Sequence, residues 1–298
     1  MNKEELKTIV AQMLREMEAG KPERAAEPPV KSGEYRTTEP VGNDVLGDIT
    51  AIDLRQQYLV SEPHNASAFL ALKAKTPARI GLGRAGTRYK TATMLRFRAD
   101  HAAAQDSVFS LVPEDFAKQN GLIPVQTECR DKDEYLTRPD LGRRFDEHNQ
   151  KVIREVCKDQ RVVLVIGDGL SSAAILANAL DCAAAIRQGL RSYGIETAVK
   201  GLFVQFCRVG AGDQIGDLTG CELVCMLVGE RPGLVTNESM SAYLTYRPHR
   251  GVSESKRTVV SNIHRQGVSA VEAGAHIASL IDRCLKQKTS GIELEAGQ

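Results

Sequence analysis

Residues 162–172 read VVLVIGDGLSS, in which five apolar residues precede a turn that contains two glycines and two serines. Five consecutive valine, leucine and isoleucine side chains are typical of a strand that is buried on both faces. The glycines allow a tight turn, and Ser171 or Ser172 can cap the alanine-rich helix that we expect to continue to about Leu190. A strand, a tight turn and a helix in this order predict one βα unit of a parallel sheet.

Outward from this unit, apolar strand-like runs alternate with helical patterns. Residues 202–206 and 223–228 predict two more buried strands, and residues 268–285 predict a closing helix with a broad apolar face. From residue 47 to residue 110 helical signals dominate. We therefore expect an α/β protein, in which a small N-terminal helical domain (47–110) precedes a Rossmann-like C-terminal domain with a mostly parallel sheet (111–298).

The helical domain carries two helix signals and one motif that suggests a nucleotide. Asn65 is placed to cap a helix that continues to Leu72, and Thr91 or Thr93 can open a second one. Residues 81–86, GLGRAG, match the dinucleotide fingerprint GxGxxG. That fingerprint must follow a buried strand, whereas here it follows a polar helix end and turn, so we do not expect a nicotinamide site.

The N-terminus has the layout of a tethered docking peptide. Residues 1–20 place apolar side chains at helical spacing, and residues 21–46 contain four prolines among polar residues, which is typical of a flexible linker. A helix of about 15 residues is marginal in water unless its apolar side is covered. We interpret residues 1–20 as an amphipathic docking or targeting helix, with a frayed terminus as the alternative.

Composition excludes several classes of partner. The chain has 39 Lys and Arg residues against 38 Asp and Glu residues, so no overall charge attracts nucleic acid or an anionic membrane. No apolar run reaches the roughly 18 to 20 residues that a transmembrane helix needs, and no secretory signal is evident. We expect a cytoplasmic protein with no nucleic-acid or membrane partner, whose seven scattered cysteines are reduced packing residues.

The sequence does not predict a catalytic or metal site within this chain. Cys221 and Cys225 lie in an apolar run without a second pair of ligands, and none of the six histidines forms a metal-binding pair. The sequence also lacks a G-x-S-x-G elbow and a phosphate-binding loop that ends in GK[ST]. We expect neither catalytic residues nor a metal site.

Ligands of open α/β sheets bind beyond the carboxyl ends of the strands. Two strand ends are therefore candidate sites: the turn at 167–172, and GERPG at 229–233, where Glu230 can accept hydrogen bonds from amide groups of a ligand. A purely structural turn explains the first equally well, and a salt-bridged surface turn explains the second. The loop at 262–267 is a weaker third candidate.

Seven segments in one order carry a resemblance to a known family. Together they resemble the small subunit of ethanolamine ammonia-lyase, and they span residues 83 to 292. The segments are GRAG (83–86), YLTRPD (135–140), DGLS (168–171), DQIG (213–216), LVGERPGL (227–234), SNIH (261–264) and SGI (290–292).

The resemblance implies a two-subunit enzyme. It implies that a large TIM-barrel subunit, in an assembly with several copies of each chain, converts ethanolamine to acetaldehyde and ammonia by radical chemistry. Adenosylcobalamin would lie between the subunits, and the family's cofactor contacts map here to Val209, Glu230 and Val259. The chain also lacks the Asp-x-His-x-x-Gly run by which other cobalamin proteins present a histidine to cobalt. This absence is consistent with base-on binding.

The resemblance also implies a location, since ethanolamine breakdown is commonly enclosed in a bacterial microcompartment. Residues 1–20 would then bind shell or cargo proteins. Two alternatives stay open: a stand-alone Rossmann-like module that binds a small ligand, and a structural adaptor.

Overall fold

A computed structural model describes residues 49–197 and 201–296 of the chain. Residues 48–298 form one compact unit. The expected docking helix at 1–20 and the linker at 21–46 lie outside the described residues. Within the described ranges, none of the helices combines the length and the apolar character that crossing a membrane requires.

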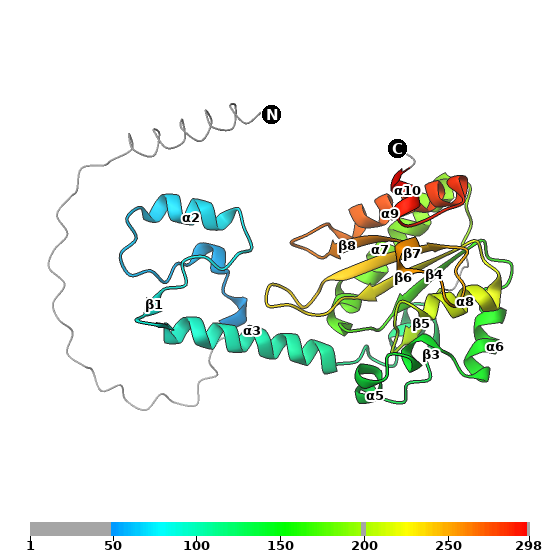
Figure 1. Ribbon diagram of the computed structural model, residues 1–298, viewed down its shortest axis with the longest axis horizontal. Helices are drawn as coiled ribbons and strands as arrows, with labels where there is room; N and C mark the ends of the chain where they lie inside the picture. The colour runs from blue at the N-terminus through cyan, green and yellow to red at the C-terminus, as the bar shows by residue number, and fades with distance from the viewer. Residues whose placement is uncertain (1–48, 198–200, 297–298) are drawn as a thin grey trace. The chain divides into compact units, whose positions relative to one another are not determined.

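The first part of this unit is helical, as the sequence predicts (Figure 1). Asn65 caps its first α-helix, because its side chain accepts a hydrogen bond from the N–H of Ala68. The motif GLGRAG at 81–86, at which no nucleotide site was expected, contains the first strand of a short antiparallel hairpin and is not a strand-to-helix turn. The elements are η1 (Ile49–Ala51), η2 (Leu54–Gln56), α2 (Ala66–Ala74), β1 (Arg84–Ala85), β2 (Arg88–Tyr89) and α3 (Thr91–Phe109).

A six-stranded sheet forms the centre of the second part. Its strand order is β3-β5-β4-β6-β7-β8, in which the first four strands are parallel and the last two are antiparallel. The expected α/β fold with a mostly parallel sheet is therefore confirmed. The strands are β3 (Ile123–Gln126), β4 (Val162–Gly167), β5 (Leu202–Gln205), β6 (Leu223–Gly229), β7 (Met240–Tyr246) and β8 (Arg257–Ile263).

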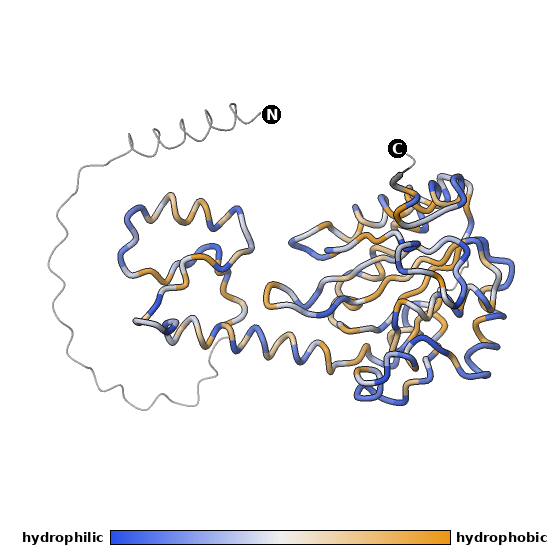
Figure 2. Tube along the Cα trace, viewed as in Figure 1, coloured by the Kyte–Doolittle hydropathy of each residue, from blue (hydrophilic) through white to orange (hydrophobic). Residues whose placement is uncertain are grey.

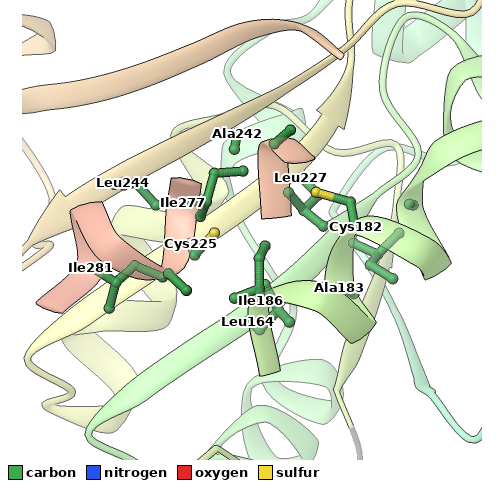
Figure 3. Packing of buried hydrophobic residues seen from close by; sticks show 14 of the residues in the cluster. Leu164, Cys182, Ala183, Ile186, Cys225, Leu227, Ala242, Leu244, Ile277 and Ile281 are labelled. Atoms are coloured by element: carbon green, nitrogen blue, oxygen red, sulfur yellow. The ribbon is translucent and has the colours of Figure 1, made fainter. Parts of the chain in front are cut away.

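Helices cover both faces of the sheet. On one face, α7 (Ser172–Ser192) and α9 (Ala270–Gln287) pack against the strands in the larger core (Figure 3). On the other face, α6 (Glu147–Val156) and α8 (Ala211–Thr219) enclose a second core. The shorter helices are α4 (Phe116–Gln119), α5 (Lys132–Thr137), η3 (Leu141–Arg143), η4 (Glu254–Lys256) and α10 (Ile292–Ala296).

Burial follows the sequence pattern that predicted β4. All six residues of β4 are buried, because helices cover both faces of this central strand. Figure 2 shows apolar stretches along the strands and polar stretches along α6 and the outer loops. All seven cysteines are buried and form no disulfide bond, in agreement with their expected role in packing.

Helix starts depend on local capping. Ser171 caps α7 by accepting a hydrogen bond from the N–H of Ala174. The closing helix begins at Ala270, two residues later than expected, because Ser269 and Glu272 form a reciprocal capping box. These caps determine where α7 and α9 begin.

Candidate functional site

The sheet has a topological switch point between β4 and β5. The chain leaves β4 into α7, which belongs to the larger core, and leaves β5 into α8, which lies on the opposite face. Since β4 and β5 are adjacent and parallel, their following loops diverge and a crevice opens beyond their carboxyl ends. This is the place where a doubly wound sheet binds its ligand.

A cavity of about 380 Å³ lies at this edge. Its walls come from α5, from the turn after β4, from the loop after β5, from the end of β6 and from β7. The lining residues are Tyr135, Leu170, Cys207, Arg208, Val209, Val228, Gly229, Glu230, Arg231 and Tyr243. Two of the three expected site residues, Val209 and Glu230, therefore line one cavity.

Glu230 is held in place by the β6–β7 hairpin. Its N–H donates to the carbonyl oxygen of Ser239 at 2.9 Å. Its carboxylate accepts hydrogen bonds from the Ser239 hydroxyl at 3.0 Å and from the Ser241 hydroxyl. Among the residues that the structure describes, it forms no ion pair. A carboxylate has about four acceptor positions, so two remain for a ligand.

The end of β6 is packed tightly against the turn that follows β4. A Cβ atom at Gly229 would collide with the carbonyl oxygen of Ser171, so only glycine fits beside this turn. The N–H of Leu170 donates to the Gly229 carbonyl oxygen at 3.3 Å. This contact fixes the position of Glu230, the next residue.

Val209 lies in the loop between β5 and α8. It is half-buried, and the N–H of Gly212 donates to its carbonyl oxygen at 3.1 Å. At the start of this loop, Phe206 adopts a left-handed backbone with a φ of 55°. Such a conformation is costly for a residue other than glycine and is concentrated at functional sites. The turn at Phe206 directs the chain toward the cavity.

Arg208 carries the positive charge beside Val209. Its Nη2 donates to the carbonyl oxygen of Tyr135 at 2.7 Å, and its Cζ lies 4.2 Å from the centre of the Tyr135 ring. Its Nε is buried and has no hydrogen-bond acceptor within the described chain. The Tyr135 hydroxyl donates to the Cys207 carbonyl oxygen at 3.2 Å, and burial raises the pKa of this phenol, which therefore stays neutral.

Two buried charged residues, Asp168 and Lys132, hold the turn after β4 that lines the cavity. The carboxylate of Asp168 accepts hydrogen bonds from the N–H of Val112 at 3.0 Å and from the Ser172 hydroxyl at 2.9 Å. Burial raises the pKa of Asp168, and Lys132 opposes that shift. Lys132 in turn donates to the Gly169 carbonyl oxygen at 3.0 Å. These contacts give the turn at 167–172 a structural role.

Val259 lies beside the cavity and does not line it. It faces Tyr243 in the register of β7 and β8, and its side chain is 47% exposed. Cross-strand partners project on the same face of a sheet, so Val259 extends the apolar wall that Tyr243 begins. The contacts of Val209, Glu230 and Val259 with a ligand stay predictions.

Other parts of the cavity were missed by the sequence reasoning. Tyr243 lies on β7, a strand that the sequence did not indicate. Tyr135 lies in the segment YLTRPD, which carried the family resemblance but was given no role. A signal for Tyr135 therefore existed, whereas Tyr243 could be placed only by the fold.

A second cavity, of about 190 Å³, lies in the helical part and is lined mainly by apolar side chains. Its arginines are already paired, since Arg79 and Arg96 both contact Asp100, at 2.7 and 2.9 Å. Within residues 49–197 and 201–296, no group of three or more His, Cys, Asp and Glu side chains is placed to hold a metal ion. The sheet-edge cavity is the better candidate site.

Comparison with known proteins now identifies the family. The family model described as "Ethanolamine ammonia-lyase light chain" matches residues 66–295. A protein from Clostridioides difficile named "Ethanolamine ammonia-lyase small subunit" is 55% identical over 298 residues, which cover 99% of this chain and 100% of the relative. A protein of the same name from Listeria innocua is 53% identical over 297 residues, with the same coverage. The chain belongs to the ethanolamine ammonia-lyase light chain family.

Membership of the light chain family confirms the resemblance seen in the sequence, and it makes this chain a component of an ammonia-lyase. The match to the light chain family begins at residue 66 and therefore includes every residue that lines the sheet-edge cavity. The cavity belongs to the part of the chain that defines the family.

Proposed function

We propose that this chain is the small subunit of an adenosylcobalamin-dependent ethanolamine ammonia-lyase. In this proposal it pairs with a large catalytic subunit, in an assembly with several copies of each, and the enzyme converts ethanolamine to acetaldehyde and ammonia. The sheet-edge cavity binds part of the cofactor at the interface between the subunits. The observation that carries the proposal is that Val209 and Glu230 line one cavity in a chain whose relatives bear this name over their full length.

The lining of the cavity fits a portion of cobalamin. A corrinoid has wide apolar surfaces, a rim of amide groups and a phosphodiester that carries its nucleotide base. A cavity of about 380 Å³ is at the small end of ligand sites and accommodates a portion of so large a molecule. Val209, Leu170 and Val228 supply apolar contact, and the buried Nε of Arg208 lacks an acceptor among the described residues.

Each residue has a distinct task in this proposal. Glu230, fixed by two serine hydroxyls, accepts hydrogen bonds from an amide group of the cofactor rim. Val209 and Val259 provide flat apolar contact that orients the cofactor and excludes water. When bound, the cofactor supplies a radical through its cobalt–carbon bond.

The remaining chemistry is assigned to the large subunit. We assign no catalytic residue to this chain, whose sequence contains no recognisable nucleophile motif. We also propose base-on binding, because the chain has no Asp-x-His-x-x-Gly run to place a histidine at cobalt. The part of this chain is therefore to hold and orient the cofactor.

Reconstitution tests the proposal. The purified chain, mixed with the large subunit and adenosylcobalamin, is expected to give ethanolamine-dependent acetaldehyde formation. Glu230→Ala should weaken cofactor binding by the complex by roughly 10- to 100-fold, which is the range for a hydrogen bond to a charged group. Glu238→Ala, which removes an exposed carboxylate from the same hairpin, serves as the matched control.

Three results would contradict the proposal. Absence of turnover in the reconstituted complex would exclude the lyase function. Tight nucleotide binding by the chain alone would favour a stand-alone binding module. Unchanged cofactor affinity in the Glu230→Ala complex would exclude the assigned site.

Residues 1–20 are proposed to direct the enzyme into a bacterial microcompartment by binding shell or cargo proteins. The support is the amphipathic pattern of this segment and the proline-containing stretch behind it. Deletion of residues 1–20 should leave the activity of the reconstituted complex intact and abolish co-localisation with shell proteins. Unchanged localisation would contradict this role.

A further inference from the structure

Arg208 has a charge that nothing in the described chain balances. Its guanidinium makes one hydrogen bond, to the Tyr135 carbonyl oxygen, and no ion pair with a carboxylate in residues 49–197 and 201–296. Arg187 also has a buried Nε without an acceptor, but it borders a space of only about 10 Å³. Arg208 instead lines a cavity large enough for a ligand group.

The side chain of Arg208 is preorganised. The backbone N–H of Arg208 donates to the Gly142 carbonyl oxygen at 2.9 Å. A Cβ atom at Gly142 would lie 2.7 Å from Arg208 Cγ, so glycine leaves room for the aliphatic part of the arginine side chain. The Tyr135 ring and carbonyl oxygen then hold the guanidinium. A group fixed in this way loses little conformational entropy when it binds a partner.

Three charged residues line the cavity, namely Arg208, Glu230 and the exposed Arg231. Lys132 reinforces the positive field near Arg208, while its own charge is opposed by Asp168. Glu230, the carboxylate of the cavity lining, is bound by serine hydroxyls and does not pair with Arg208. A ligand that suits this cavity presents an anionic group to Arg208 and hydrogen-bond donors to Glu230.

We infer that Arg208 recognises the phosphodiester of the cofactor's nucleotide tail. The inference rests on the proposed function, because cobalamin combines neutral amide groups with one phosphodiester. The planar guanidinium fork matches the geometry of phosphate oxygens, and Arg208, which lines the cavity and has no carboxylate partner within the described chain, gains a counter-charge. Arg208 is thus a binding residue that positions the base side of the cofactor.

Two corrinoids that differ by one phosphate test the inference. Adenosylcobinamide and adenosylcobinamide phosphate both lack the nucleotide base, and only the second carries the phosphate. Each is allowed to compete with adenosylcobalamin for the two-subunit complex in equilibrium dialysis. The wild-type complex should prefer the phosphate form by roughly 10- to 100-fold, as expected for a charge-assisted hydrogen bond.

Substitutions assign that preference to a residue. Arg208→Gln should reduce it to about 1-fold, and Arg208→Lys should keep part of it, because lysine retains the charge without the planar fork. Arg191→Gln is the matched control, since it removes a positive charge from an exposed side chain that does not line the cavity and should leave the preference intact. Circular dichroism and co-purification with the large subunit verify that each variant is folded and assembled.

The outcomes separate the inference from the proposed function. A complex that does not bind adenosylcobalamin would exclude both. The role of Arg208 alone would be overturned if the wild-type complex binds adenosylcobalamin but the two cobinamides compete for it equally well. The same holds if neither cobinamide competes. A preference that survives in Arg208→Gln, or that disappears in Arg191→Gln, would overturn it as well.

Discussion

Two arginines near α8 have opposite surroundings. Arg257, on β8, donates to both carboxylate oxygens of Asp213 at 2.8 Å and to Glu254 at 2.7 Å. Arg208, just before α8, has a carbonyl oxygen and an aromatic ring as its partners and no carboxylate within the described chain. The first arginine is fully satisfied by its own protein, and the second is not.

This difference indicates a structural role for Arg257 and a ligand-binding role for Arg208. Arg257 joins an edge strand to the first turn of α8, and its charge is compensated where it is buried. Such an ion pair is tolerated because its hydrogen bonds are complete. Arg208 lines a cavity and has no carboxylate partner within the described chain, which is the arrangement expected of a residue whose partner is a ligand. Substitutions around Arg257 should therefore affect mainly stability, and substitutions of Arg208 should affect mainly ligand binding.

The largest expected effect is on the compensated pair. Asp213→Ala leaves Arg257 buried without its main partner and should lower the free energy of unfolding by about 3–5 kcal/mol. Arg208→Gln breaks no ion pair and should cost about 1 kcal/mol. Urea unfolding of the two variants measures both values. Equal losses in the two variants would remove the distinction between the arginines.

Substitution of the buried Lys132 should lower the free energy of unfolding by a smaller amount. Lys132→Met removes the hydrogen bond to the Gly169 carbonyl oxygen and the positive charge that opposes the raised pKa of Asp168, and it should cost roughly 1–3 kcal/mol at neutral pH. Lys158→Met, at an exposed lysine, is the control and should be neutral.

The loss at Lys132 should depend on pH. Burial raises the pKa of Asp168 above 3.8, so its contribution to stability is present below that pH and is lost as the pH rises through the folded-state pKa. Removal of Lys132 raises this pKa further. The stability of Lys132→Met should therefore decline more steeply above pH 4 than that of the wild type, and a parallel decline in urea midpoints would contradict an effect of the Lys132 charge on Asp168.

Glu254 should contribute less than about 1 kcal/mol, because its side chain is 75% exposed. Its hydrogen bond with Arg257 lowers the pKa of Glu254 below 4.5, so this contribution is present above pH 4.5 and is lost as the pH falls through the folded-state pKa. Glu254→Gln should therefore match the wild type in acid and be slightly less stable at neutral pH. Urea midpoints at both pH values measure the difference, and a loss that is equal at both would contradict it.

The smallest effect concerns the cavity wall. Burial, and next the Glu230 carboxylate, raise the pKa of Tyr243. Glu230→Gln should lower the pKa of Tyr243 slightly toward 10, and ultraviolet difference titration against the wild type measures this change. Glu238→Gln, which changes an exposed carboxylate on the same hairpin, should leave it unaltered. An identical titration in Glu230→Gln would show that Glu230 does not face Tyr243.

The sequence predicts the central sheet where burial is uniform. The VVLVI run became β4 because helices cover both faces of this strand, and the strands at 202–206 and 223–228 have the same apolar character. β7 and β8 were missed because neither contains a long apolar run: β7 (MSAYLTY) includes Ser and Thr although it is largely buried, and β8 (RTVVSNI) is partly exposed. Val259 and Val260 gave only a short apolar signal within β8.

The candidate site was predictable only in part. Glu230 follows a strand directly, so its position at the sheet edge follows from local sequence. Tyr135 and Tyr243 reach the same cavity from distant parts of the chain, through contacts that no local pattern encodes. The uncompensated charge of Arg208 also depends on which carboxylates the fold places elsewhere, and it could be recognised only in three dimensions.

Hydrogen exchange of the two-subunit complex, with and without adenosylcobalamin, tests most directly that the sheet-edge cavity holds the cofactor. If the cavity holds the cofactor, exchange should be slower with the cofactor in residues 207–212 and 229–232, which contain Arg208, Val209 and Glu230. Residues 254–258, around the satisfied Arg257, should exchange at the same rate in both states. Unchanged exchange at 207–212 and 229–232 in a complex that has bound the cofactor would show that the cofactor does not lie in this cavity.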